Sequence, residues 1–289
     1  CFPPLMALAL PLMGNRLVLN LLAGAEAVWI PNRLQQYGLS DAGAFSVYGV
    51  LTGMALPFIF FPSAVTNSLA VVLLPTVAEA QARDNSSRIE KTIAAALRYS
   101  LYMGIFCIGL FTLLGPDLGM TVFRNQTAGQ YIAVLAWLCP FMYISTTMGS
   151  ILNGLGKTSS VFLHNAVSML VNLAFVVFGI PRMGMRAYFY GLLLSELLLA
   201  LLHLRCLHKA VRVSIEPWEM IVKPCLCLAA AAGLLKLCAP ALASLKAAGM
   251  NEFLCLAGQG AVVSAGYGGL LWQMHRARRR QNRSSRFDS

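Results

Sequence analysis

Residues 149–160 read GSILNGLGKTSS, and the string GLGKTS inside them is typical of a loop that binds the phosphates of a nucleotide. Such a loop requires the pattern G-x-x-x-x-G-K-[ST] between a buried strand and a helix. Gly156 and Lys157 fit the end of that pattern, but Ile151 occupies the position of its first glycine. The residues before it form a long apolar run of the kind that makes a membrane helix. We therefore interpret residues 154–159 as a short turn between two helices, with nucleotide binding as the alternative.

Arg16, Asn20 and Glu26 are polar residues within one apolar run, and their types suit the binding of a charged ligand. Arg16 and Asn20 are four residues apart and share a helix face, where a guanidinium and an amide can bind an anionic headgroup. Glu26 lies ~15 Å from Arg16 along a helix axis, so an ion pair between them is not expected. Charged groups in apolar spans usually face a cavity or a partner. Two alternatives stay open, because Arg16 can extend to the membrane interface and Glu26 can pair with Arg33.

Ser63, Thr66 and Asn67 follow Pro62 in a second apolar run, which also contains Pro57. Each proline removes a backbone donor and is expected to kink the helix. The functional hypothesis is a broken helix whose polar residues line a substrate path, as in many transporters. The structural alternative is that the hydroxyl groups satisfy backbone carbonyls that the proline releases.

The remaining polar residues do not predict a catalytic, metal or cofactor site. Glu196 is a second acid within an apolar run, and the sequence reveals no partner for it. The eight cysteines lie mostly inside apolar runs and form no paired ligand spacing with the four histidines, so we expect small packing groups rather than metal ligands. We expect the histidines near the cytoplasmic helix ends, at the interface and without a catalytic role: His164, His203, His208 and His275.

The composition indicates the elements that must position these residues. Of the 289 residues, 58% are hydrophobic and 11% are charged, whereas soluble domains carry roughly 25% charged residues. A helix needs ~20 apolar residues to cross the hydrocarbon core. The sequence therefore predicts an all-α, polytopic membrane protein with about eight transmembrane helices, over about 5–31, 43–77, 93–115, 131–153, 160–181, 184–205, 221–240 and 251–273.

The distribution of basic residues predicts the orientation. The connections after the second, fourth and sixth spans and the tail hold fifteen of the 22 lysines and arginines, and the other connections hold five. Basic connections face the cytoplasm, so we expect a multi-pass plasma-membrane protein with a cytoplasmic C-terminus. The basic tail is expected to touch anionic membrane lipids, and nucleic acid is not an expected partner.

Three strings carry a resemblance to a known family, at residues 15–82, 135–158 and 178–199. Together they resemble the stage V sporulation protein B family, in the polysaccharide-flippase branch of the multidrug/oligosaccharidyl-lipid/polysaccharide exporter superfamily. The resemblance covers roughly residues 1–210 and fades after about residue 215. Members of this superfamily have two six-helix lobes that face a central cavity, often followed by two further helices.

The resemblance implies a division of the chain into a C-terminal lobe of six helices (1–210), two additional transmembrane helices (211–275) and a basic cytoplasmic tail (276–289). It also implies that an N-terminal lobe of the same protein is a partner, and that the chain is the C-terminal part of that protein. The spans counted above would then be the seventh to fourteenth helices of the whole transporter.

The function that the resemblance implies is transport of a lipid-linked saccharide or peptidoglycan precursor by alternating access, in spore cortex or cell-envelope synthesis. The expected substrate-binding residues are Arg16, Asn20, Glu26, Ser63, Thr66 and Asn67. No enzymatic activity is expected, since a membrane enzyme needs clustered acids or a histidine base at a membrane face. The alternatives are a cation-coupled multidrug exporter, which the acids Glu26 and Glu196 would suit, and a membrane scaffold of envelope assembly.

Overall fold

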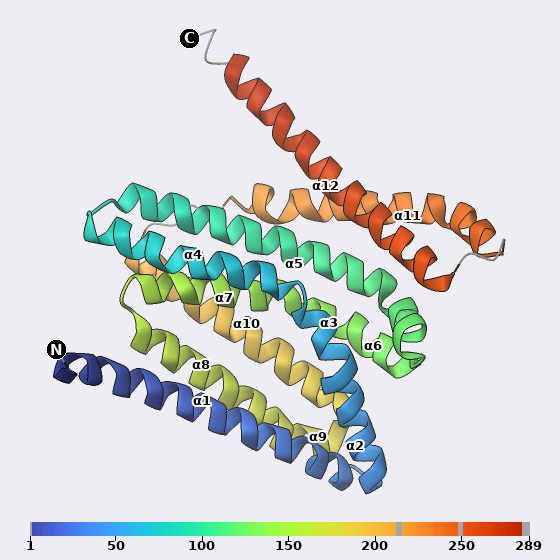
Figure 1. Cartoon of the computed structure of the whole chain (residues 1–289), viewed down its shortest axis with the longest axis horizontal. Coiled ribbons are helices and arrows are strands. Elements are labelled where there is room, and N and C mark those ends of the chain that lie inside the picture. Colours follow the sequence, from blue (N-terminus) through green and yellow to red (C-terminus); the bar gives the residue numbers. More distant parts are fainter. Residues whose placement is uncertain (1, 212–215, 248–250, 285–289) are drawn as a thin grey trace. The chain divides into compact units, whose positions relative to one another are not determined.

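The computed structural model describes the backbone of residues 2–211, 216–247 and 251–284, and the side chains of residues 17–211, 216–238, 240, 251–274 and 276. Every regular element of these residues is helical (Figure 1). The α-helices are α1 (Phe2–Gln36), α2 (Asp41–Val50), α3 (Leu56–Phe60), α4 (Ser63–Ala82), α5 (Ser86–Phe123), α6 (Gln126–Leu135), α7 (Cys139–Gly154), α8 (Thr158–Ala174), α9 (Ile180–Met183), α10 (Met185–Ala210), α11 (Lys223–Ala247) and α12 (Glu252–Ser284). Four short turns of other helix types join them: the π-helical η1 (Leu51–Ala55), η3 (Phe175–Gly179) and η4 (Trp218–Val222), and the 3₁₀ turn η2 (Ala136–Leu138).

Each of these four turns ends two residues before a proline, at Pro57, Pro140, Pro181 and Pro224. A proline cannot donate to the carbonyl four residues earlier, so the helix before it must wind differently. In η1 the N–H of Leu56 donates to Leu51 O, five residues back, and η3 and η4 do the same. The prolines thus explain where these long helices change their winding.

Eight helices of the described residues are long and apolar enough to cross a membrane: Asp41–Phe60, Ser63–Ala82, Ser86–Phe123, Gln126–Gly154, Thr158–Met183, Met185–Ala210, Trp218–Cys238 and Glu252–Met274. Helix α1, whose side chains are described only from residue 17 onwards, is not among these eight. The expectation of an all-α, multi-pass membrane protein is confirmed.

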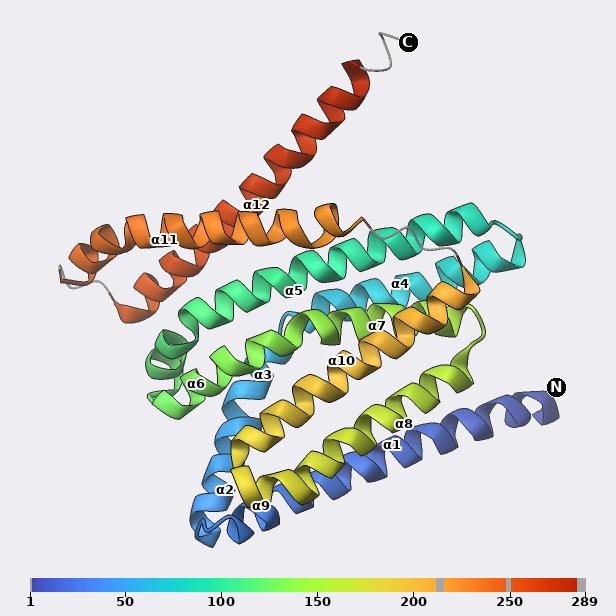
Figure 2. The ribbon, with the colours of Figure 1, turned by 180° about the vertical axis from the view of Figure 1, so that it is seen from behind.

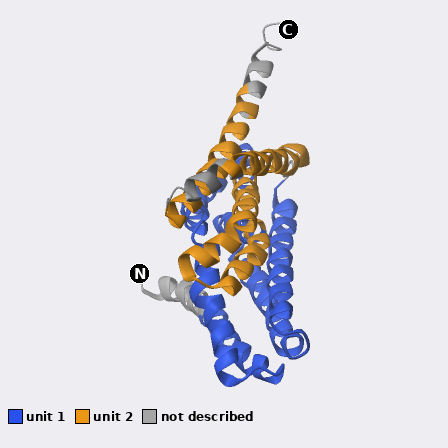
Figure 3. Ribbon diagram, turned by 90° about the vertical axis from the view of Figure 1, so that its right-hand side faces the viewer, with its two compact units in different colours: residues 1–96, 141–214 blue, residues 97–140, 215–289 orange. Residues whose placement is uncertain are grey.

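The chain forms two compact units, which Figure 3 shows in different colours. The first unit comprises residues 1–96 and 141–214, and the second comprises residues 97–140 and 215–289. These units describe contacts within the chain, so the expected division at residues 210 and 275 into a lobe, two added helices and a tail stays a prediction.

In the first unit, α1, α8 and α10 lie side by side, as Figures 1 and 2 show from opposite sides. Gly184 joins α9 to α10 with a φ of 61°, a conformation that favours glycine. A Cβ atom at Gly184 would lie only 2.9 Å from Cε1 of Tyr37, which directly follows α1. The end of α1 and the start of α10 therefore meet at one end of this unit.

Helices α4 and α7 run in the same direction. Both of them end on the side of the first unit that lies opposite Gly184. The Ser150 hydroxyl donates to the carbonyl of Ala70, and a Cβ atom at Gly154 would lie 2.7 Å from Leu74 O. The turns that follow these two helices, at residues 83–85 and 155–157, therefore lie at the same end.

The second expected span, 43–77, is divided in the structure. Its residues form α2–η1–α3 and α4, which are separated at Phe61–Pro62. Because α1 ends near Gly184 and α4 ends at the opposite end, residues 41–82 make one net passage through the unit. At 1.5 Å per residue this segment is roughly 60 Å long, about twice the hydrocarbon thickness, so it must bend.

In the second unit, close backbone approaches and buried hydroxyl groups join the helices. Gly119 of α5 packs against Gly129 of α6, where a Cβ atom would lie 2.3 Å from the Gly129 nitrogen. The Tyr267 hydroxyl of α12 donates to Tyr102 O, and the Tyr102 hydroxyl donates to Glu219 O. These contacts connect α5, η4 and α12 in the interior of the unit.

Candidate functional site

Glu26 lies in a polar cluster in the first unit. Its Oε1 accepts a hydrogen bond from Nδ2 of Asn172 on α8. The hydroxyl groups of Tyr48 on α2 and Tyr188 on α10 are close enough to interact electrostatically with the carboxyl group. Four helices therefore bring polar groups together around Glu26, and we call Glu26, Tyr48, Asn172 and Tyr188 the Glu26 cluster.

Small residues on α10 let the helices around this cluster come close together. A Cβ atom at Gly191 would lie 2.9 Å from Asn172 Oδ1 and 2.6 Å from Phe175 Cβ. One turn further along α10, the Ser168 hydroxyl of α8 donates to the carbonyl of Ser195. The interface of α8 and α10 thus fixes the Asn172 side chain that holds Glu26.

The alternative pairing of Glu26 with Arg33 is wrong. Arg33 Nη1 instead donates to Gln36 Oε1 at 2.7 Å, and Glu26 turns towards α8. Two helical turns separate Glu26 from Arg33, whereas Asn172 lies directly across the interface of α1 and α8.

The other candidate residues of α1 do not join this cluster. The backbone of Arg16 lies within α1, and its side chain lies outside the described residues. Asn20 is exposed on the surface of the first unit. Their proposed role in binding an anion therefore stays a prediction.

The candidate residues of α4 divide into two kinds. The Ser63 hydroxyl donates to Phe60 O at 2.6 Å, and the Thr66 hydroxyl donates to Ser63 O at 2.9 Å. These bonds agree with the structural interpretation, in which hydroxyl groups satisfy carbonyls where the helix is broken. Asn67, in contrast, is exposed. Pro62 is the N-cap residue of α4, and Pro57 lies in the first turn of α3.

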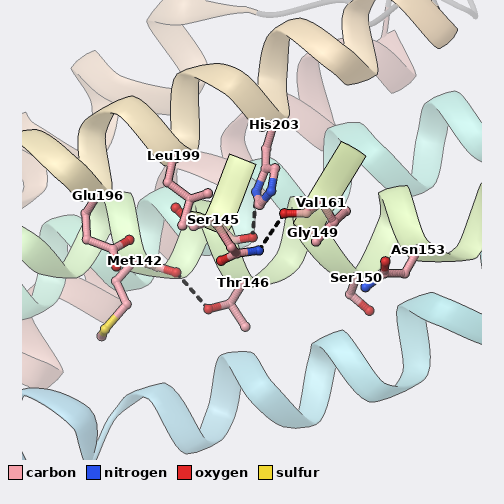
Figure 4. A pocket seen from close by; sticks show the side chains of 11 residues that line it. Met142, Ser145, Thr146, Gly149, Ser150, Asn153, Val161, Glu196, Leu199 and His203 are labelled. Carbon is pink, nitrogen blue, oxygen red and sulfur yellow. Dashed lines mark hydrogen bonds between the residues drawn. The ribbon is translucent and has the colours of Figure 1, made fainter. Parts of the chain in front are cut away.

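A polar pocket of about 360 Å³ lies between α7, α8 and α10 in the first unit. Figure 4 shows Glu196, Leu199 and His203 projecting from α10 towards Ser145, Thr146 and Gly149 of α7. Nδ1 of His203 lies 3.2 Å from Ser145 O, and the His164 ring on α8 packs against the His203 ring with centroids 5.2 Å apart. We call this the Glu196 pocket.

The expectation that the four histidines lie at the membrane interface stays a prediction, but His203 is buried and only 2% exposed. It is buried because Gly149 leaves space for its ring: a Cβ atom there would lie 3.2 Å from His203 Cε1. His208 is exposed, as expected, and the His275 side chain lies outside the described residues.

The sequence prediction missed Asn172, Ser145 and His203. Asn172 and Ser168 are four residues apart in an apolar run, as are Ser145 and Gly149, so each pair shares a helix face. This spacing of small and polar residues is a signal for close helix contacts inside a membrane bundle. It does not identify the facing helix.

The string GLGKTS forms the turn that was expected. Gly156 has a φ of 73°, Lys157 is the N-cap residue of α8, and the helix α7 precedes them where a nucleotide-binding loop requires a strand.

Within the described residues, no group of three or more histidine, cysteine, aspartate or glutamate side chains is arranged to hold a metal ion.

Comparisons with known proteins find two curated sporulation proteins that are similar to this chain. No protein-family model matches the chain. It is 25% identical over 217 residues to stage V sporulation protein B of Bacillus subtilis (strain 168), a match that covers 74% of this chain and 42% of that protein. It is 27% identical over 214 residues to sporulation protein YkvU of the same organism, covering 73% of this chain and 48% of that protein. The chain thus spans about half the length of the curated relatives that it matches, and it is a multi-pass membrane relative of the stage V sporulation protein B family.

Proposed function

We propose that this chain is the C-terminal lobe, with two added helices, of a flippase that moves a lipid-linked saccharide or peptidoglycan precursor across the plasma membrane during sporulation. The observation that carries the proposal is the similarity to stage V sporulation protein B along about three quarters of the chain. The whole transporter then needs an N-terminal lobe of the same protein as its partner. No covalent chemistry is required, because the two lobes expose one site to each side of the membrane in turn.

Exposed polar residues on apolar helices support this proposal. Asn20 on α1 and Asn67 on α4 are exposed amides in helices that are mostly apolar. An amide that faces lipid tails has no hydrogen-bond partner, which is costly. Both residues suit a surface that faces a second lobe or a polar substrate headgroup.

Replacement of Arg16 tests the proposed binding of an anionic headgroup. Arg16→Gln in the complete natural protein should reduce the yield of heat-resistant spores about tenfold or more, because a charge-assisted hydrogen bond contributes roughly 1.5–3 kcal/mol and ~1.4 kcal/mol is a factor of ten. Arg16→Lys keeps the charge and loses the planar donor pair, so it should be partly active.

The matched control is Lys236→Gln, which removes an exposed basic residue from α11 and should leave the spore yield unchanged. Membrane abundance is measured for every variant by immunoblotting. Full activity of Arg16→Gln at normal abundance would contradict a role of Arg16 in binding the substrate.

The proposed orientation places residues 83–91, residues 154–159 and the tail in the cytoplasm. Cysteines introduced at Ser87, Thr158 or Ser284 in a cysteine-free background should not react with an impermeant thiol reagent in intact cells, and should react after permeabilisation. Gln126→Cys, at the opposite side of the membrane, should react in intact cells. Labelling of Ser87→Cys or Thr158→Cys from outside would reverse the orientation.

A second candidate function is cation-coupled export of drugs, and two half-buried acids favour it. Glu26 and Glu196 are carboxyl groups inside membrane helices, which is the chemistry that binds cationic ligands. Increased drug sensitivity of cells that lack the protein, together with a normal spore yield, would favour this function over the flippase.

A further inference from the structure

The hydroxyl groups of α7 that line the Glu196 pocket have already used their hydrogens. The Thr146 hydroxyl donates to Met142 O at 2.8 Å, and the Ser150 hydroxyl donates to the carbonyl of Ala70. A hydroxyl group has one hydrogen and two lone pairs, so both oxygens can still accept a hydrogen bond but cannot donate another. The two residues are one helical turn apart and project from the same side of α7 (Figure 4).

Helices α8 and α10 add further acceptors to the same pocket. Nδ2 of Asn165 on α8 donates to Val161 O at 2.8 Å, which leaves the amide oxygen as an acceptor, and Glu196 on α10 contributes its carboxyl group. The side chains of Thr146, Ser150, Asn165 and Glu196 are half-buried, so part of each remains accessible. A ligand of this pocket must therefore supply several hydrogen-bond donors.

The charges of the pocket exclude an anionic ligand group. The described residues that line it include no lysine or arginine, and His203 already donates through Nδ1 to Ser145 O. A phosphate or carboxylate group needs charged donors, and to bury it among acceptors is costly. The pocket therefore suits an uncharged group and does not suit a diphosphate.

Apolar side chains complete the lining and narrow the class of ligand. Met142, Val161 and Leu199 lie beside the polar residues. A sugar ring carries hydroxyl donors around its edge and apolar C–H groups on its faces, so it matches both kinds of side chain. The volume of about 360 Å³ is near the lower end of the ~300–1,000 Å³ range of small-ligand pockets, which suits a single sugar ring rather than a whole headgroup.

We propose that the Glu196 pocket binds an uncharged sugar ring of the transported lipid, through the hydroxyl groups of that ring. Thr146 and Ser150 of α7, Asn165 of α8 and Glu196 of α10 accept the hydrogen bonds, so the bound sugar joins three helices of the first unit. The proposal rests on the proposed flippase function and deepens it, because it assigns the saccharide to this pocket and the diphosphate to residues elsewhere in the complete protein.

Binding of two lipids to the complete natural protein in detergent tests the site. One lipid is a polyprenyl diphosphate that carries a disaccharide, and the other is the same polyprenyl diphosphate without a sugar. The variants are Thr146→Val, which keeps the shape of the side chain but removes the acceptor, and Thr146→Ser, which keeps the hydroxyl group. Thr76→Val is the matched control, since the Thr76 hydroxyl also donates to a carbonyl four residues earlier, at 2.7 Å, and does not line the pocket.

We expect the wild type to bind the lipid with the disaccharide more tightly than the bare lipid. Thr146→Val should weaken binding of the disaccharide lipid about fivefold, equivalent to ~1 kcal/mol, and leave binding of the bare lipid unchanged. Thr146→Ser and Thr76→Val should bind both lipids like the wild type. The unfolding midpoint of every variant is measured, and Asn165→Leu, with the same expected selective loss, replaces Thr146→Val if that variant does not fold.

Arg16→Gln separates this proposal from the flippase function. If Arg16 binds the anionic headgroup, its replacement should weaken both lipids, because both carry the diphosphate. The sugar proposal is overturned if the disaccharide adds no affinity, or if Thr146→Val, or Asn165→Leu in its place, weakens both lipids equally or neither of them. If neither lipid binds to the wild type, the flippase function is wrong, and the sugar proposal is wrong with it.

Discussion

Gly119→Ala should prevent normal folding of the chain in the membrane. The added Cβ atom would lie 2.3 Å from the nitrogen and 2.4 Å from the Cα of Gly129, which are backbone atoms that cannot rotate away. The turn between α5 and α6 is also tightly held, since Asn125 N donates to Gly119 O and Asn125 Oδ1 accepts from Ala128 N. Overpacking of this kind typically costs 1–3 kcal/mol or more.

The measurement is the amount of monodisperse protein extracted from membranes, together with its unfolding midpoint. Gly233→Ala is the matched control, because Gly233 lies in the membrane helix α11 and a Cβ atom there would meet nothing within 4 Å. Alanine should be neutral or stabilising at that position by up to ~1 kcal/mol. Equal yields and midpoints for the two variants would show that α5 and α6 do not pack as described.

Glu26→Ala should destabilise the first unit and abolish function in the complete protein. Asn172 Nδ2 would lose its acceptor, and Oδ1 of the same side chain already has no partner within the described residues. A buried amide without partners costs roughly 1–3 kcal/mol, so we expect the unfolding midpoint to fall by several degrees. Glu79→Ala is the control, since its exposed ion pair with Arg83 contributes at most ~1 kcal/mol.

Glu26→Gln separates the structural role of Glu26 from its charge. Glutamine keeps an oxygen that can accept from Asn172, so the unfolding midpoint should stay near that of the wild type. A normal midpoint with a lost spore yield would show that the negative charge of Glu26 is needed for function. Normal spore yields of both Glu26→Gln and Glu26→Ala would remove Glu26 from the candidate substrate-binding residues.

The sequence correctly predicted the class of protein and most of its helices. A surplus of apolar residues in long runs can be buried only in a membrane, and backbone groups inside a membrane require helices, so no tertiary information was needed. The GLGKTS turn was also predictable, since a phosphate-binding loop needs a glycine at position 151 and a preceding strand.

The second span shows where hydropathy alone is insufficient. Residues 43–77 form one apolar stretch, so the pattern predicts one helix, whereas the structure breaks it at Phe61–Pro62. The prolines indicated that a kink was present. The packing of α4 against α7 and of Tyr37 against Gly184 was needed to show that both pieces together make one net passage.

The amino-acid sequence by itself determined that this is an all-helical, multi-pass membrane protein, that prolines disturb its second apolar run, and which polar side chains lie inside apolar runs. Only the tertiary structure decided which of those side chains meet: Glu26 with Asn172, and Glu196 with Ser145, Asn165 and His203 in one pocket. The physical reason is that a helical period specifies which residues share a face. The neighbour of that face is decided by close packing at Gly149 and Gly191, between helices far apart in the sequence.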